Sequence, residues 1–192
     1  MVDHNKRKLK YESELNPLMD FIQTEYCESS LCVFRSVLSV PPTEIDSTPQ
    51  SKRLLDFRPE EFDLQLAKED VDLMTDGERR EYVGNLAISV FKSKEKAEKN
   101  VKDFVRHIAR SYSQEEAKVY LEERRGPYVV QLQLSSDVGL LERKFNKKGH
   151  ANLLLYENVD IKDHIVEVYP PIRFEEIIST IKNEGTNDGD KK

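Results

Sequence analysis

The residues of this chain that could do chemistry are few and scattered. The four histidines, His4, His107, His150 and His164, are far apart, and none has a second ligand at the short spacing typical of a metal site. The sequence has no phosphate-binding glycine loop and no nucleophile elbow. The common sequence signatures of metal, phosphoryl-transfer and acyl-transfer chemistry are therefore absent. The remaining candidates for chemistry are single residues in unusual positions.

His150 is the best acid–base candidate among them. It follows Gly149 and stands at the start of a dense apolar run, 151–156, which predicts a strand. An imidazole at the start of a strand is well placed to contact a ligand or to transfer a proton. A structural or solvent-edge histidine fits the same pattern, so the sequence leaves both roles open.

Cys27 and Cys32 are the only cysteines. A catalytic thiolate needs a neighbouring base or a helix N-terminus to lower its pKa, and the local sequence contains no histidine. We therefore expect two buried, reduced thiols, as in the reducing cytosol. The N-terminus is charged with no apolar signal core, and no apolar run is long enough to span a bilayer. A cytoplasmic location away from membranes is expected.

Arg35 lies in the middle of an apolar segment, 31–40, which predicts a strand. Strand alternation places Arg35 on the same side as Val33 and Val37, where a charge is costly unless it is paired or contacts a ligand. One alternative is an edge strand on which Arg35 reaches a carboxylate. The other is a phosphate or pyrophosphate contact, which suits the planar guanidinium fork.

Ser89 is the third candidate, because it lies inside the predicted strand 86–91, which leads directly into a helix. A serine at this position can also be structural, with its hydroxyl bonded to the backbone. The strand ending in Phe34-Arg35 and the segment ISVFKSKEKA (88–97) together resemble the ADP-ribosyltransferase superfamily in its broad sense, including RES-type toxin domains.

The resemblance implies a site for NAD or another nucleotide. Arg35 would contact the pyrophosphate, Ser89 would lie beside the nicotinamide and orient the ribose, and His150 would act in acid–base or positioning work. The superfamily also needs a glutamate on a late strand, and here the match fails: His150 stands near that position, and Glu142 and Glu157 are the nearest acids. The sequence does not decide whether the protein is an enzyme.

The charges support a different hypothesis, because they are segregated within a chain of net charge −6. Segment 56–81 holds ten acids and four bases, whereas segment 92–110 holds seven bases and three acids. Such runs are usually solvated helix faces, but a basic face also suits a phosphate-bearing ligand such as a nucleotide or RNA. The alternative function is therefore a non-enzymatic protein-interaction module that uses both segments as contact surfaces. Binding to DNA is not expected.

The elements around these residues predict an α+β fold. Strands are expected at 31–40, 86–91, 128–134, 151–156 and 165–169, with a hairpin-like turn at 157–160 between the last two. Helices are expected at 15–26, after the cap Ser93, after the capping box at 113–116, and at 174–181. The helix after Ser93 has the clearest apolar stripe and should pack on the sheet.

Helices and strands do not alternate regularly, which favours a mixed or mostly antiparallel sheet of about five strands with helices packed on it. The dipeptide Asp76-Gly77 predicts a turn. A chain of 192 residues is expected to form a single domain, here 11–184. Disordered tails are predicted at 1–10 and 185–192, since they lack apolar anchors.

Overall fold

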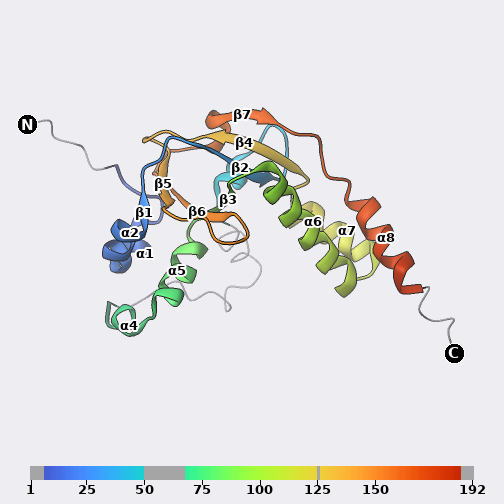
Figure 1. The fold of residues 1–192 in the computed structure, drawn as a ribbon, viewed down its shortest axis with the longest axis horizontal. Coiled ribbons are helices and arrows are strands. Elements are labelled where there is room, and N and C mark those ends of the chain that lie inside the picture. Colours follow the sequence, from blue (N-terminus) through green and yellow to red (C-terminus); the bar gives the residue numbers. More distant parts are fainter. Residues whose placement is uncertain (1–6, 50–67, 125, 187–192) are drawn as a thin grey trace, which may run out of the picture.

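An open antiparallel sheet organises the chain. A computed structural model describes residues 7–49, 68–124 and 126–186. Seven strands of this described part are hydrogen-bonded in the order β1-β5-β6-β3-β2-β4-β7 (Figure 1), and all neighbouring pairs are antiparallel. The strands are β1 Tyr26–Cys27, β2 Cys32–Val37, β3 Ile88–Phe91, β4 Tyr128–Gln133, β5 Gly139–Glu142, β6 His150–Leu155 and β7 Ile165–Val168.

The predicted α+β class with a mostly antiparallel sheet is confirmed, and the five expected strands correspond to β2, β3, β4, β6 and β7. Two further strands were missed. β5 has only four residues, and β1 has two and directly follows a helix. Such short strands lack the alternation that identifies a strand from sequence, and they exist here because they pair with each other and with β6.

The register assigns each strand residue to one of two faces. Phe34 pairs with Phe91, and Phe91 pairs with His150, so these three side chains share a face. We call it the helical face, because the helices described below pack on it. The opposite, loop face carries Arg35 and an apolar cluster that includes Val33, Val37 and Ile161. Segments 41–48 and 157–164 contact this loop face through Asp46 and Ile161.

The described helices are α1 Glu12–Leu15, α2 Met19–Glu25, α4 Lys68–Leu73, α5 Asp76–Asn85, α6 Lys94–Ser111, α7 Gln114–Arg124 and α8 Phe174–Thr186. Short 3₁₀ turns are η1 Asn16–Leu18, η2 Glu44–Ser47 and η4 Ile161–His164. The predicted turn at Asp76-Gly77 is wrong. Thr75 and Glu78 form a capping box, with the Thr75 hydroxyl accepting from the Glu78 amide, so these residues begin α5.

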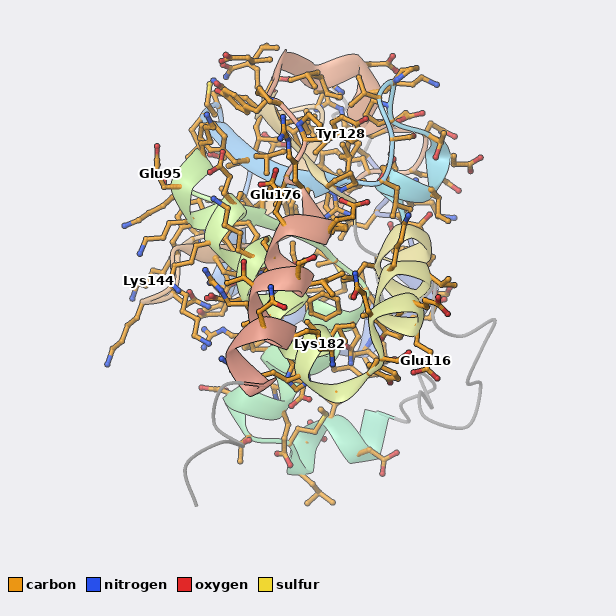
Figure 2. The ribbon with its side chains drawn as sticks, turned by 90° about the vertical axis from the view of Figure 1, so that its right-hand side faces the viewer. Glu95, Glu116, Tyr128, Lys144, Glu176 and Lys182 are labelled. Atoms are coloured by element: carbon orange, nitrogen blue, oxygen red, sulfur yellow. The ribbon has the colours of Figure 1, made fainter. Side chains whose placement is uncertain are left out.

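The helix predicted after Ser93 is α6, and its cap is confirmed, since Ser93 Oγ accepts from the Lys96 amide. Its apolar stripe packs on the sheet only at the N-terminal end, where Ala97 meets Phe91 and Val129. Beyond Ala97 the stripe is buried between α7 and α8 (Figures 1 and 2), and Val101 and Ile178 share one cluster. The expectation that the stripe packs on the sheet therefore holds only for its N-terminal end, because the rest of α6 extends beyond the sheet and packs against α7 and α8.

The other half of the helical face is covered by α1, α2 and α5. Their buried side chains form one cluster with Leu154 and Tyr156 at the β6 end; it includes Leu15, Leu18, Ile22, Tyr26, Val83 and Leu86. The helical face thus has two separate apolar layers, one under α6 and one under α2 and α5. No helix of the described residues is long and apolar enough to cross a membrane.

The chain ends differ from the predicted tails. Residues 1–6 and 187–192 lie outside the described residues, but the described part of the N-terminal segment is bound to the sheet. Leu9 is buried, and the main chain of Lys8 and Lys10 pairs with residues 155–157. Gly185 lies within the last turn of α8 rather than after it. Leu9 is the apolar anchor that the prediction of a loose 1–10 segment overlooked.

The predicted hairpin at 157–160 is also wrong. β6 and β7 are separated in the sheet by β3, β2 and β4, so the segment between them crosses the loop face. Ile161 is buried there against the sheet. A turn does occur there, since Asn158 has a positive φ of 73°. A turn alone, however, does not specify which strand pairs with β6.

Candidate functional site

Arg35 is held by main-chain carbonyls. Its side chain is 5% exposed on the loop face, and its Nε and one terminal nitrogen donate to the carbonyl of Asp46 at 3.1 and 2.9 Å. The other terminal nitrogen donates to the carbonyl of Ser89 at 2.9 Å. The guanidinium therefore joins β2 and β3 to the loop that contains η2. The edge-strand alternative for Arg35 is wrong, because β2 lies between β3 and β4 inside the sheet.

Asp46 extends this arrangement. It is fully buried, and its carboxylate accepts from the amide of Leu38 at 2.8 Å and from that of Thr43 at 3.1 Å. The next residue, Ser47, donates to Asp160 at 3.0 Å and accepts from the Ile161 amide. Arg35, Asp46, Ser47 and Asp160, here called the Arg35 network, therefore fasten two loops to one face of the sheet.

Ser89 and His150 lie on the other face. Ser89 pairs with Asn152 across β3 and β6, and two residues further along Phe91 pairs with His150. The imidazole of His150 packs edge-on against the ring of Phe91, with 5.4 Å between ring centroids. The Ser89 side chain is exposed. The structure thus brings Ser89 and His150 near each other but leaves the Arg35 side chain on the opposite side of the sheet.

Four polar side chains cross the helical face in one line. The register pairs Tyr26 with Glu142 and Asn152 with Ser89. Glu142 lies beside Asn152, because its carboxylate accepts from the main-chain amide of Asn152 at 3.1 Å. We call Tyr26, Glu142, Asn152 and Ser89 the polar row. It runs across β1, β5, β6 and β3, from Tyr26 at 2% exposure to the exposed Ser89. A continuous row of this kind in the middle of a sheet face is costly unless each group finds a partner.

Tyr26 lacks an acceptor for its proton. Its hydroxyl is buried, and no acceptor among the described residues completes a hydrogen bond from it. Burial raises the pKa of the phenol above its ordinary value of 10.0, and the negative charge of Glu142 raises it further, whereas the side-chain amide of Asn152, directed at the phenol oxygen as a donor, lowers it. The phenol therefore stays protonated near neutral pH and can donate a hydrogen bond to a molecule that reaches it.

Glu142 links the row to the helices above it. Its other carboxylate oxygen lies 2.9 Å from Nε of Arg80 on α5, and a terminal nitrogen of Arg80 lies 2.9 Å from Glu25 at the end of α2. The following residue, Arg143, donates to the carbonyl of Thr24 in the last turn of α2 at 2.8 Å. The carboxylate is 8% exposed while Arg80 is half-exposed, so the ion pair lies at the border between core and solvent.

Gly84 places α5 close to the row. It lies one helical turn after Arg80, and a Cβ at Gly84 would come within 3.3 Å of the Asn152 amide nitrogen. The absence of a side chain at Gly84 therefore gives the Asn152 amide its space. Together α5, α2 and the sheet confine the buried end of the row, and the Ser89 end remains accessible.

Sequence reasoning named Ser89, His150 and Glu142 but missed Tyr26, Asn152 and Arg80 as neighbours of these residues. Asn152 carried a usable signal, because it interrupts the apolar run 151–155 in the same way that Arg35 interrupts its strand. Tyr26 and Arg80 carried none, since they reach the site only through the pairing of β1 with β5 and the packing of α5.

The structure describes the basic segment 92–110 completely but the acidic segment 56–81 only in part. Residues 56–67 of the acidic segment lie outside the described residues. In the basic segment, Lys94 and Lys102 pair with Glu98, and Lys99 and Arg106 pair with Asp103. Pairing within the helix accounts for much of the charge of α6.

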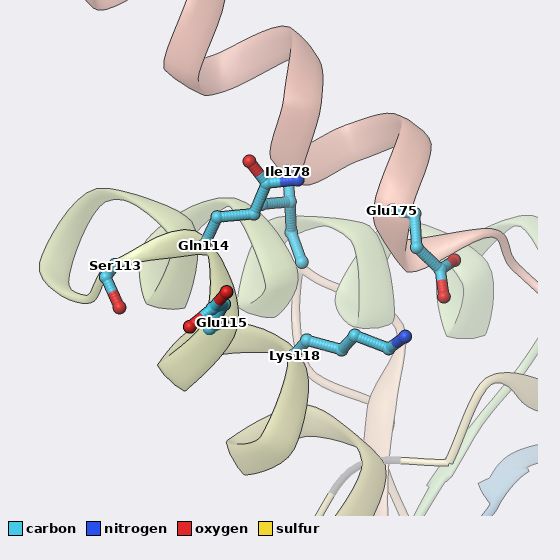
Figure 3. Close-up of a pocket in the computed structure, with 6 residues that line it drawn as sticks. All are labelled: Ser113, Gln114, Glu115, Lys118, Glu175 and Ile178. Carbon is cyan, nitrogen blue, oxygen red and sulfur yellow. The ribbon is translucent and has the colours of Figure 1, made fainter.

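The helical layer contains surface pockets of its own. One of about 500 Å³ lies between α7 and α8 (Figure 3) and is lined by Ser113, Gln114, Glu115, Lys118, Glu175 and Ile178. Another of about 350 Å³ lies between α6 and α8. None of the predicted site residues lines either pocket, and no group of three or more potential metal ligands occurs in the described part of the chain.

Comparisons of this chain with protein-family models, with curated proteins and with solved structures gave no match.

Proposed function

We propose that the protein binds a nucleotide of the NAD class, with the polar row contacting the ribose. The observation that carries this proposal is the Tyr26 hydroxyl, which is buried and whose proton finds no acceptor among the described residues. It lies at one end of a row whose other end, Ser89, faces solvent. A buried donor without a partner costs about 1–3 kcal/mol, which a ligand oxygen would recover on binding.

The chemistry of the row suits a ribose. Carboxylate and amide groups commonly accept from and donate to a vicinal diol, as acidic residues do in dinucleotide sites. Glu142 and Asn152 supply these groups side by side, and Ser89 and Tyr26 add hydroxyls at either end. The four side chains offer both donors and acceptors without a second buried charge.

The phosphates would lie toward the start of α6. His150 is on the same face two residues from Asn152, and the preceding Gly149 packs against the side-chain stem of Lys96. Lys96 lies in the first turn of an 18-residue helix, whose positive dipole end also favours anions. Arg35 has no part in this proposal, because its donors are bound to carbonyls on the other face.

If the resemblance to ADP-ribosyltransferases holds, Glu142 would be its carboxylate. Of the two nearest acids, Glu142 lies in the row, whereas Glu157 is exposed beyond the far end of β6. Nicotinamide release from NAD, measured on the wild-type protein, decides whether binding leads to turnover. The binding proposal itself does not depend on that result.

The test is a thermal-shift and calorimetric titration with NAD, ADP-ribose and ATP. A ligand that binds only the folded state raises the melting temperature. Ser89→Phe should abolish the shift by filling the open end of the row, and its fold should survive because position 89 is exposed. Gln133→Phe is the matched control, since it places the same side chain at an exposed position of β4 on the same face.

We expect the Gln133→Phe variant to bind like the wild type. Absence of any heat or shift with all three nucleotides on the wild type would end the proposal. Unchanged binding by the Ser89→Phe variant would move the site elsewhere.

A further inference from the structure

Five lysines without partners gather where the β5–β6 connection meets the start of α6. Lys144, Lys147 and Lys148 lie in the connection 143–149, and Lys92 and Lys96 lie at the β3–α6 junction. We call them the lysine patch. Among the described residues no carboxylate lies within ion-pair distance of any of the five, although four other basic residues of α6 are paired.

Gly149 brings the two groups of lysines together. It has a φ of +76°, and a Cβ there would lie 3.1 Å from the Lys96 stem and 3.2 Å from the Lys92 stem. The Lys92 amide donates to the Gly149 carbonyl at 2.9 Å. The aliphatic stems therefore pack against position 149, where the positive φ and the space left by the stems both favour glycine. Lys92 is exposed and Lys96 is half-buried, so their stems can pack while the charged ends reach toward solvent.

The turn that presents the other lysines is well fixed. The Asn146 side-chain oxygen accepts from the amides of Lys148 and His150, and the Gly149 amide donates to the Asn146 carbonyl. Lys147 and Lys148 occupy the exposed middle of this turn, and Lys144 extends away from the ribbon (Figure 2). The neighbouring Arg143 points elsewhere, because its guanidinium is bound to the end of α2. Hydrogen bonds thus fix the turn that carries these lysines, whereas their ammonium groups form no ion pair with the described residues.

We infer that the lysine patch binds the phosphodiester backbone of a single-stranded nucleic acid. Lysine ammonium groups are hydrated point charges that contact phosphates without geometric selectivity. None of the large exposed apolar side chains of the described part belongs to the patch, so it lacks the anchors that protein interfaces use, and lysine is depleted in such interfaces.

The net charge of the whole chain favours a thin, flexible anionic strand over a flat anionic membrane as the partner. Its net charge is −6 despite this patch, so the remaining surface is acidic. A flat anionic membrane would bring that acidic surface within a Debye length of about 8–10 Å and be repelled by it. A flexible strand can follow the turn and the helix start and contact little else. This inference rests on the unpaired lysines and does not require the nucleotide site.

The test compares the triple variant Lys144→Gln, Lys147→Gln, Lys148→Gln with the wild type in fluorescence anisotropy with a labelled single-stranded RNA. We expect the variant to bind at least about tenfold more weakly at low salt, and its slope of log affinity against log salt to fall by about 2. The matched control, Lys99→Gln, Lys102→Gln, Arg106→Gln, removes the same charge from paired positions of α6 and should bind like the wild type.

Single-stranded DNA of the same sequence identifies the sugar preference, and either strand bound by the patch supports the inference. Equal losses in both triple variants would show a net-charge effect and overturn it. Absence of RNA binding by the wild type, or stronger binding to phosphatidylserine vesicles than to RNA, would also overturn it. Nucleotide titrations of the Lys144→Gln, Lys147→Gln, Lys148→Gln variant keep the two proposals apart, because its polar row is intact.

Discussion

The two buried polar clusters of this protein lie on opposite faces of one sheet and differ in how fully their hydrogen bonds are made. In the Arg35 network the guanidinium donates to two carbonyls, and the Asp46 carboxylate accepts from two main-chain amides. In the polar row the Tyr26 hydroxyl is buried, its proton has no acceptor in the described part of the chain, and Ser89 is exposed to solvent. The Arg35 network thus finds hydrogen-bond partners within the chain, whereas the polar row keeps a donor without an acceptor in the described part of the chain.

This difference teaches how a buried polar residue should be interpreted. A polar group whose partners are all supplied by its own chain stabilises a connection between elements. A buried group left without a partner lowers stability, and such groups are rare enough in folded proteins to call for an explanation. From sequence, Arg35 appeared the more suggestive residue for ligand binding, but the structure gives it three carbonyl contacts and leaves Tyr26 incomplete.

The largest expected effect is that of Arg35→Ala. It should lower the free energy of unfolding by about 3–5 kcal/mol, because the carbonyls of Asp46 and Ser89 lose their donors and a cavity forms. Arg173→Ala, which removes an exposed arginine paired with Glu176, should change it by less than about 0.5 kcal/mol. Urea unfolding of both variants measures the difference, and wild-type stability of the Arg35 variant would contradict a structural role.

Asp46→Ala should cost less, about 2 kcal/mol, because two amides, those of Leu38 and Thr43, lose their acceptor. Asp46→Asn keeps one oxygen and should cost roughly half as much. The same urea experiment ranks the three proteins. Equal stability of all three would mean that the loop holding η2 contributes nothing to the fold and that the Arg35 network is not cooperative.

The third prediction uses the pKa of Tyr26, which burial raises above 10.0 in the folded protein. The fold favours the protonated phenol, so its contribution is present below pH 10 and is lost as the pH rises above it. Stability of the wild type should fall there by up to about 1.4 kcal/mol per pH unit relative to Tyr26→Phe. Tyr156 and Tyr169, whose pKa values are raised to about 12, act equally in both proteins. Parallel stability curves would show that Tyr26 is not the titrating group.

The smallest expected effect is that of Tyr26→Phe at neutral pH. Since the hydroxyl proton has no acceptor among the residues that the structure describes, its removal should change the free energy of unfolding by less than about 0.5 kcal/mol or raise it slightly. Tyr156→Phe is the control, because its hydroxyl donates to Glu28 at 3.0 Å and its loss should cost about 1 kcal/mol. If both variants lose the same stability in thermal unfolding, the row is as closed as the Arg35 network.

Local sequence signals predicted much of the fold. Ser93 and the box at 113–116 set the starts of α6 and α7, because capping uses residues only three apart. Strand alternation correctly placed Arg35 beside Val33 and Val37 on one face. These features depend on neighbours along the chain, so the order of residues alone specifies them.

The candidate site could not be predicted in this way. Its residues come from positions 26, 89, 142 and 152, and they meet because β1 pairs with β5, β5 with β6, and β6 with β3. A two-residue strand such as β1 has no pattern of its own. The sequence did show that Arg35 must have partners, but whether these were a ligand or the carbonyls of Asp46 and Ser89 was decided only by tertiary packing. The physical reason is that alternation is local, whereas pairing partners and the contents of a face arise from contacts between segments far apart in the chain.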